Sequence, residues 1–285
     1  MLRLKGKVAI VTGGATGIGE AICKKFAREG AIVIVNGLPN DPIKDVVEAI
    51  IQAGGQAYGY AEDISEPENA KECIKLTVKK CGKLDILINN AGAFPEINEI
   101  QKYSNEAFFY MLKNNVVSAF MMTKYAIPEL RKTRGCIVSA GSESGILGIA
   151  ENAPYGGTKG FIHSFMKGVA VEQAKYGIRA NCVAPGAIDT AWTHKETSEM
   201  TKKMEKMIIS ATPMGRRGTP EEIANIYLYL ASEEASFVTG AVWSADGGIT
   251  VSKGPVGLEV PDKLKKEPES TLDLEHTMEG ATYLK

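Results

Sequence analysis

Tyr155 and Lys159 have the residue types and the spacing that proton transfer needs. On a helix, residues four apart project from one face, so this spacing places an ammonium group beside a phenol. A free tyrosine has a pKa of about 10 and is a poor base near neutral pH, but a nearby positive charge favours its phenolate. Tyrosine and lysine at this spacing are also common on solvated helices, so other residues must support the interpretation.

The position of Ser142 supports it. This serine lies thirteen residues before Tyr155, shortly after the apolar run 135–140, where the carboxyl end of a strand opens onto the ligand crevice of an open sheet. Its hydroxyl can donate a hydrogen bond to a substrate oxygen on which negative charge develops. Together, Ser142, Tyr155 and Lys159 indicate acid/base chemistry at a carbonyl or alcohol oxygen.

The glycine-rich segment TGGATGIG, residues 12–19, connects an apolar run to a helical pattern. Glycines let a backbone turn tightly against a pyrophosphate, and a helix N-terminus offers unpaired N–H groups and a positive dipole end. Such turns also occur for packing alone, but this one follows the first predicted strand of an alternating chain, which favours a dinucleotide site. The expected cofactor contacts here are Gly13, Thr16, Gly17, Ile18 and Gly19.

These residues must be positioned by an alternation of short apolar runs and helical patterns. The runs are too apolar to have one wet face, which is typical of a buried parallel sheet. The pattern predicts a single α/β domain over residues 1–249, with a doubly wound, Rossmann-like sheet of seven strands and helices on both faces. The predicted strands are 8–12, 32–36, 56–61, 84–89, 135–140, 178–183 and 241–245, and the predicted helices are 18–29, 42–53, 67–81, 105–130, 155–176 and 220–231.

In this order, TGGATGIG, NNAG at 89–92 and YGGTK at 155–159 resemble the motifs of the short-chain dehydrogenase/reductase family, in its subclass without a separate substrate domain. PGAIDT at 185–190 and later segments also match, so the resemblance covers about residues 5 to 249. It implies an NAD(P)-dependent oxidoreductase that transfers hydride between the nicotinamide and a carbonyl or secondary alcohol of a small molecule. The further cofactor contacts that it implies are Asp63, Ile64, Asn90, Ala91, Gly92, Pro185, Gly186, Ile188 and Thr190, besides Tyr155 and Lys159.

The resemblance also implies a role for each of four residues. Ser142 would polarise the carbonyl, and Tyr155 would exchange the proton. Lys159 would lower the pKa of Tyr155 and bind the ribose, while Asn115 would hold a water of a proton relay; by itself, Asn115 suits a buried helix asparagine equally well. The chain departs from the family at 139–141 and at 156–157, where Ser-Ala-Gly and Gly-Gly stand in place of Asn-Ile-Ser and Ser-Ala. The helix glycines either loosen the helix or make room beside the nicotinamide.

The end of the second predicted strand bears on the choice of nucleotide. NAD-preferring relatives have an acid there that binds the ribose hydroxyls and repels a 2′-phosphate. This chain has Asn36, Gly37 and Leu38 instead, and neither Thr16 nor Leu38 is the basic residue of many NADP-preferring relatives. The sequence therefore allows NAD(H) or NADP(H) and favours NADP(H), with Asn36 and Asn40 as neutral donors.

Substrate contacts are expected in the loops at the carboxyl ends of the strands, namely at Phe94, 146–152 and 192–210. The substrate itself is not predicted. Two alternatives stay open. One is an isomerase or dehydratase of the same superfamily, although these usually have a longer C-terminal domain and a different glycine spacing. The other is a non-catalytic nucleotide sensor, which the presence of all four site residues disfavours.

The composition excludes several functions. The formal net charge is −1, so no field attracts nucleic acid or an anionic membrane. No apolar run has the length of a signal peptide or a membrane span, which predicts a cytoplasmic protein. The five cysteines are widely spaced, which predicts neither disulfides nor a metal site.

Two further expectations concern assembly. The predicted helices 105–130 and 155–176 carry apolar residues on more than one face, and in the family these helices pair across a dimer axis, which predicts a homotetramer. Residues 250–285 extend beyond the family's usual end and contain too few large apolar residues for a core of their own. We expect this extension to pack on the body or on a neighbouring subunit.

Overall fold

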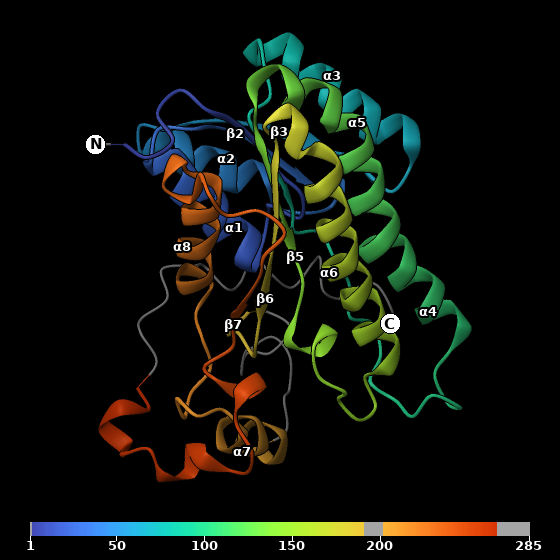
Figure 1. The fold of residues 1–285 in the computed structure, drawn as a ribbon, viewed down its shortest axis with the longest axis vertical. Helices are drawn as coiled ribbons and strands as arrows, with labels where there is room; N and C mark the ends of the chain where they lie inside the picture. The colour runs from blue at the N-terminus through green and yellow to red at the C-terminus, as the bar shows by residue number, and fades with distance from the viewer. Residues whose placement is uncertain (1, 191–201, 267–285) are drawn as a thin grey trace.

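Seven parallel strands form one sheet in the computed structural model, which describes residues 2–190 and 202–266 (Figure 1). The strand order is β3-β2-β1-β4-β5-β6-β7, so the chain changes direction between β1 and β4. This order confirms the predicted doubly wound, Rossmann-like fold. The strands are β1 (Val8–Val11), β2 (Ile32–Gly37), β3 (Gln56–Ala61), β4 (Ile86–Asn89), β5 (Cys136–Ala140), β6 (Arg179–Pro185) and β7 (Val242–Ala245).

Helices cover both faces of this sheet (Figure 1). The buried residues form two apolar clusters, one shared with α1, α2 and α8 and the other shared with α3, α5 and α6. In β1, Ala9 and Val11 belong to the first cluster and Ile10 to the second, because successive side chains of a strand point to opposite faces. The helices are α1 (Gly17–Arg28), α2 (Ile43–Gln52), α3 (Pro67–Cys81), α4 (Asn105–Leu112), α5 (Ser118–Thr133), α6 (Ala153–Gln173), α7 (Lys202–Ala211) and α8 (Pro220–Ala231).

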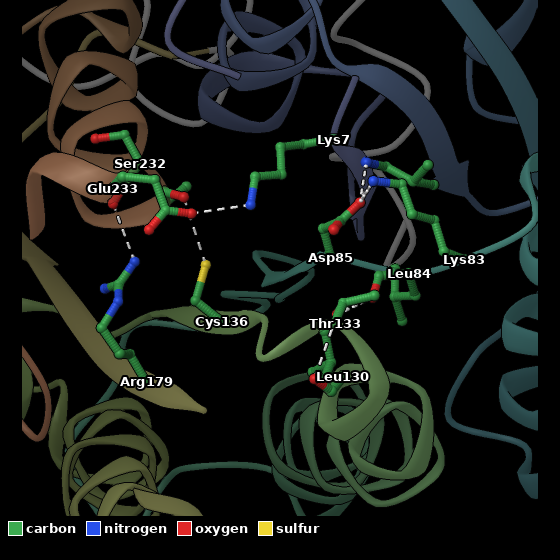
Figure 2. Close-up of polar contacts among 12 residues, drawn as sticks. Lys7, Lys83, Leu84, Asp85, Leu130, Thr133, Cys136, Arg179, Ser232 and Glu233 are labelled. Carbon is green, nitrogen blue, oxygen red and sulfur yellow. Dashed lines mark hydrogen bonds and ion pairs between the residues drawn. The ribbon is translucent and has the colours of Figure 1, made fainter. Parts of the chain in front are cut away.

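Polar side chains tie together the amino ends of the strands, at the sheet edge opposite the candidate site (Figure 2). Asp85 is 5% exposed, accepts a hydrogen bond from the backbone N–H of Val8 at 2.8 Å and pairs with Lys83 at 2.9 Å. Arg179 donates to the backbone carbonyl of Ser232 at 3.1 Å. These contacts satisfy backbone groups that the strand ladders leave unpaired.

The single helix predicted over 105–130 is interrupted in the structure. A π-helical turn, Lys113–Val117, separates α4 from α5, and Asn115 lies inside it. Hydrophobic spacing does not reveal such a turn, since one extra residue only rotates the apolar face. π-helical turns occur frequently at functional sites.

The described part of the C-terminal extension packs on its own subunit, beside α7 (Figure 1). Gly257 approaches the backbone carbonyls of Ile209 and Thr212 so closely that an added Cβ would lie 2.2 Å and 2.3 Å from their oxygens. Val260 lies against Gly215. Up to residue 266, the extension is thus held by the body of the same chain, and residues 267–285 lie outside the described part.

Candidate active site

Ser142, Tyr155 and Lys159 meet at the carboxyl end of β5. Ser142 follows the strand and begins a short 3-10 helix, Glu143–Gly145, whereas Tyr155 and Lys159 lie in the first turns of α6. Lys159 Nζ lies 5.5 Å from the centroid of the Tyr155 ring. A hydrogen bond joins the side chains of Tyr155 and Ser142. The spacing in the sequence therefore does bring these three side chains together.

Gly156 explains how the 3-10 helix approaches α6. A Cβ at this position would lie 2.6 Å from the carbonyl oxygen of Ser144, so any larger residue would force the two segments apart. Gly157 has open space around its Cα. Neither interpretation of this glycine pair included this contact, in which the first glycine allows the loop after Ser142 to pack against α6.

Burial dominates the electrostatics of the site. It raises the pKa of Tyr155 to about 12, with the hydrogen bond from Ser142 opposing this and the charge of Glu143 reinforcing it. It lowers the pKa of Lys159 to about 8, because the ammonium loses its water. In the chain without a nucleotide, desolvation of the phenolate outweighs the contacts that favour it, and the lowering of the Tyr155 pKa by Lys159 stays a prediction. Lys159 donates a hydrogen bond to the Ala140 carbonyl at 3.0 Å.

Asn115 is 2% exposed and lies close to the other three residues. Its Nδ2 donates to the Ala93 carbonyl at 3.0 Å and to Thr158 Oγ1 at 3.1 Å, and its Oδ1 accepts from the Ala93 N–H at 2.6 Å. Both amide hydrogens are therefore donated to protein groups. The side chain anchors the loop after β4 to α6, so the expected relay water would have to bind at another atom of this residue.

The glycine-rich turn after β1 forms a cradle in which side chains have no space. Gly13 and Gly17 have φ of +56° and +54°, and a Cβ at Gly19 would lie 1.9 Å from the carbonyl oxygen of Gly13. Asn90 Nδ2 donates to that same oxygen at 3.0 Å. Because the first turn of α1 directs free N–H groups into this cradle, the residues fit the pyrophosphate of a dinucleotide.

The other expected cofactor residues lie in the segments around this cradle. Thr12 Oγ1 accepts from the backbone N–H groups of Asn90 and Ala91 at 2.9 Å and 3.0 Å, which joins the NNAG segment to the cradle. Thr190 Cγ2 would lie 3.4 Å from a Cβ at Gly17. Gly92 adjoins Asn115 and Lys159, and Ile188 pairs with Gly218 in an isolated bridge. Thr16, Ile18, Pro185 and Gly186 lie in the segments so joined.

Two residues at the adenosine end have other partners than expected. The side chain of Asn36 is buried and donates to the carbonyls of Gly37, Tyr60 and Glu62. These hydrogen bonds hold β2 to the segment after β3 and occupy the amide hydrogens that were expected to serve the nucleotide. The carboxylate of Asp63 accepts from Ser65 and pairs with Lys113 at 3.0 Å. Ile64 beside it is buried.

Three acidic or basic residues near the site were not identified from the sequence. Asp41 Oδ2 accepts from the backbone N–H of Leu38 at 2.6 Å and would lie 2.6 Å from a Cβ at Gly37. Glu143 follows Ser142 in the chain. His163 contacts Ser142, whose backbone N–H donates to the imidazole. A search by strand ends and family motifs misses all three, because Asp41 and Glu143 lie just beyond the positions searched and His163 reaches the site only through the fold.

The expected substrate segments are only partly described. Phe94 lies against Tyr155, with ring centroids 4.7 Å apart, which is consistent with a place beside the reacting group. The segment 146–152 lies between Ser142 and Tyr155 as expected. Residues 191–201, with Trp192 and His194, lie outside the described part. Within the described residues, no group of three or more metal-ligating side chains converges, and no helix is long and apolar enough to cross a membrane.

A doubly wound parallel sheet with a glycine cradle at the carboxyl end of its first strand is an architecture in which dinucleotides bind. A family model described as enoyl-(acyl carrier protein) reductase matches residues 13–250, and the chain belongs to the short-chain dehydrogenase/reductase family. This family generally binds NAD(P)(H).

Individual relatives agree with this assignment. The chain is 35% identical to the uncharacterized oxidoreductase YxbG of Bacillus subtilis, over 94% of this chain and 99% of the relative. It is 35% identical to L-rhamnose-1-dehydrogenase of Scheffersomyces stipitis, over 87% of this chain and 98% of the relative. The crystal structure of gox2181 superposes with a TM-score of 0.83 at 31% identity, over 88% of this chain and 98% of that one.

Proposed function

We propose that this protein reversibly oxidises a secondary alcohol of a small molecule to a carbonyl, with NAD(P) as the hydride carrier. The observation that carries the proposal is the meeting of Ser142, Tyr155 and Lys159 at the crevice that the glycine cradle begins. When bound there, the nicotinamide supplies the chemistry of hydride acceptance and donation at its C4. The protein's own residues supply the proton and hold the substrate oxygen.

Tyr155 is the acid/base in this proposal. In reduction its phenol gives a proton to the substrate oxygen, and in oxidation its phenolate takes that proton back. Ser142 Oγ accepts from the Ser144 N–H at 3.2 Å, so its own hydrogen is free to be donated, to Tyr155 in the substrate-free site and to the substrate oxygen once substrate is bound. Lys159 places a positive charge behind the phenol, and this charge stabilises the phenolate once burial has made it unfavourable.

Asp41 leads us to propose NAD(H) as the preferred nucleotide, in contrast to the preference expected from the sequence. Its carboxylate occupies the place that the side chain of residue 37 would take, at the end of β2. An acid at this place repels a 2′-phosphate and accepts hydrogen bonds from ribose hydroxyls. With Asn36 committed to backbone carbonyls, the neutral donors that favoured NADP(H) are reduced to Asn40.

Glu143 points to the substrate class. Its Oε2 is buried without a hydrogen-bond partner among the described residues, directly after Ser142. Burial, together with the charge of Asp246, raises the pKa of this carboxyl to about 7. A buried acceptor of this kind suits a substrate with a hydroxyl next to the reacting carbon. The L-rhamnose-1-dehydrogenase relative makes sugars the first compounds to test.

Replacing Tyr155 by phenylalanine tests the function. Tyr155→Phe should abolish turnover on sugars, diols, ketones and ketoesters, as followed by nicotinamide absorbance with each nucleotide, while leaving nucleotide binding nearly intact, because only the proton donor is lost. Tyr176→Phe, at an exposed tyrosine just beyond α6, serves as the control and should keep its activity. Retention of most of kcat by Tyr155→Phe would show that another group transfers the proton. Isomerisation without net change in the nucleotide would support the isomerase alternative.

A further inference from the structure

His163 lies on α6, one turn after Lys159, and touches both ends of the loop that carries Ser142. It is 7% exposed. The backbone N–H of Ser142 donates to its Nε2 at 3.3 Å, and the imidazole also makes a hydrogen bond with the backbone of Gly145. The ring therefore spans the 3-10 helix that positions the Ser142 hydroxyl.

The glycines of this loop fit the imidazole closely. A Cβ at Gly141 would lie 2.2 Å from His163 Nε2, and a Cβ at Gly145 would lie 2.6 Å from its Cε1. Real Cβ atoms do not approach so closely, so neither position accepts a side chain while the ring is there. Gly141 is one of the positions at which the chain departs from its family. The histidine gives this departure a physical reason, because its ring fills the space that a side chain at position 141 would need.

The contacts define the protonation state of His163. Since Nε2 accepts the Ser142 N–H, it carries no hydrogen, and the ring proton of the neutral form belongs on Nδ1, where it can be donated to the Gly145 carbonyl. Protonation of Nε2 would place its N–H against the N–H of Ser142, two donors with no acceptor between them, and this would release the Ser142 backbone.

The groups around the ring favour its neutral form. Burial lowers the pKa of His163, the Gly145 contact opposes this, and the charges of Lys159 and Lys167 lower it further. On the strand side lies Cys182, which burial keeps a neutral thiol by raising its pKa to about 12. His163 is among the residues that line a surface depression of about 370 Å³, together with Ser164, Lys167 and Val242.

We propose that His163 is a positioning residue, which holds Ser142 in place as a neutral imidazole protonated on Nδ1 and releases it when the ring takes a second proton. This inference rests on the proposed function, in which the Ser142 hydroxyl binds the substrate oxygen. It predicts that carbonyl reduction falls as the pH decreases through the pKa of His163, because the Ser142 loop loses its anchor.

Two substitutions separate the acceptor from the ring. In His163→Gln the amide oxygen can reach the place of Nε2 and accept from Ser142, but it does not titrate; in His163→Leu no acceptor remains. We expect His163→Gln to retain more kcat than His163→Leu and to lose the acid limb of the reduction profile. The KM for the nucleotide should change little in either variant. Ser164→Ala, at the exposed next residue, is the control and should keep the wild-type profile.

The direction of reduction is chosen because Tyr155 is then needed protonated, so the tyrosine itself causes no loss at low pH. Glu143, whose pKa is raised to about 7, is unchanged in both variants, so any limb that it contributes is common to them and to the wild type. An acid limb that persists unchanged in His163→Gln, or equal kcat in the Gln and Leu variants, would overturn the proposal. A variant that fails to fold is recognised by its circular dichroism. In that case, NMR of the wild-type protein tests the proposal.

NMR of the ¹⁵N-histidine-labelled wild-type protein tests the same contact without any turnover. The chain has 3 histidines, so the signal absent from His163→Gln identifies the ring. We expect an Nδ1-protonated neutral tautomer with a pKa below the ordinary value of about 6.5. An Nε2-protonated ring would overturn the proposal even in an active enzyme. Conversely, absence of activity on all tested substrates together with the expected tautomer would count against the proposed function and not against the positioning of Ser142.

Discussion

Lys159 and Tyr155 make opposite demands at the scale of single residues. The site needs a charged lysine beside a phenol that can ionise, yet both groups are buried, and burial disfavours both charges. The apparent pKa of the reaction therefore depends on how far the positive charge of Lys159 offsets the cost of burying the phenolate. This balance can be measured separately in kinetics and in stability.

The kinetic prediction concerns alcohol oxidation. Its kcat/KM should rise with pH, because the phenolate is the base, and Lys159→Met should move this rise to higher pH by removing the charge that favours the phenolate. Profiles should be recorded where a deuterium isotope effect shows that hydride transfer is rate-limiting. Lys175→Met, beyond the end of α6, is the control. Identical profiles for wild type and Lys159→Met would refute the electrostatic role.

The stability prediction follows from the same burial. The pKa of Lys159 is lowered to about 8 in the folded chain, so the folded state binds fewer protons than the unfolded state between about pH 8 and the ordinary lysine pKa of about 10.4, and stability should rise through this window. Lys159→Met should therefore raise the Tm of the nucleotide-free protein below pH 8, and this gain should shrink as the pH approaches 10. A gain independent of pH would mean that packing, not charge, is its origin.

Asp41 is the residue through which the nucleotide preference can be tested. Asp41→Asn should shift the ratio of kcat/KM for NADP to that for NAD upward, about tenfold or more, because the charge that repels the 2′-phosphate is removed. Asp45→Asn, on the exposed side of the same segment, is the control. An unchanged ratio would contradict the proposed NAD(H) preference. Gly37→Asp would be a poor alternative test, since a Cβ there lies 2.6 Å from Asp41 Oδ2.

At the scale of elements, the two ends of the parallel strands serve different purposes. The carboxyl ends of the strands form the site, whereas the amino ends are tied by side chains that bind backbone groups (Figure 2). The π-helical turn around Asn115 and the close-packed glycines at 141, 145 and 156 lie on the site's side of the sheet.

The amino edge should therefore affect stability and leave the chemistry unchanged. Asp85→Ala removes the acceptor of the buried Val8 N–H and should lower the free energy of unfolding by about 1–3 kcal/mol. Lys83→Ala removes only the 42% exposed partner of the same carboxylate and should lower it by about 0–1 kcal/mol. Urea unfolding gives both values. Equal losses would show that the ion pair, rather than the backbone hydrogen bond, is the stabilising contact.

At the scale of the whole molecule, α4, α5 and α6 present an aromatic surface. Phe109, Phe120 and Phe161 are 65%, 40% and 39% exposed, and Phe165 stacks on Phe161 at 5.3 Å. A surface of this kind supports the expected homotetramer, in which these helices would pair between subunits. Light scattering at micromolar concentration should give four times the chain mass of 30.6 kDa. A monomeric mass would refute the assembly.

The C-terminal extension provides the second prediction at this scale. Asp246 accepts from Gly248 and Thr250, so a truncation should leave residues up to 251 in place. Deletion of 252–285 should lower the Tm, because it uncovers α7 and the carbonyls of Ile209 and Thr212. A chain ending at Lys266 retains the described contacts and separates their contribution from that of the remaining residues. If the chain that lacks 252–285 melts like the full-length protein, the packing on α7 does not stabilise the fold.

The order of strands and helices was predictable from the sequence, because apolar runs and helical spacing are local patterns. The meeting of Ser142 with Tyr155 was also predictable, since parallel strands bring their carboxyl ends to one edge. The position of His163 was decided by the tertiary structure alone, because His163 meets Ser142 across two packed elements. Asp41 reaches the place of a missing side chain at Gly37 through the local turn 38–41, which the strand and helix patterns do not reveal. Contacts of this kind depend on distances of a few tenths of an ångström between segments, which no spacing along the chain encodes.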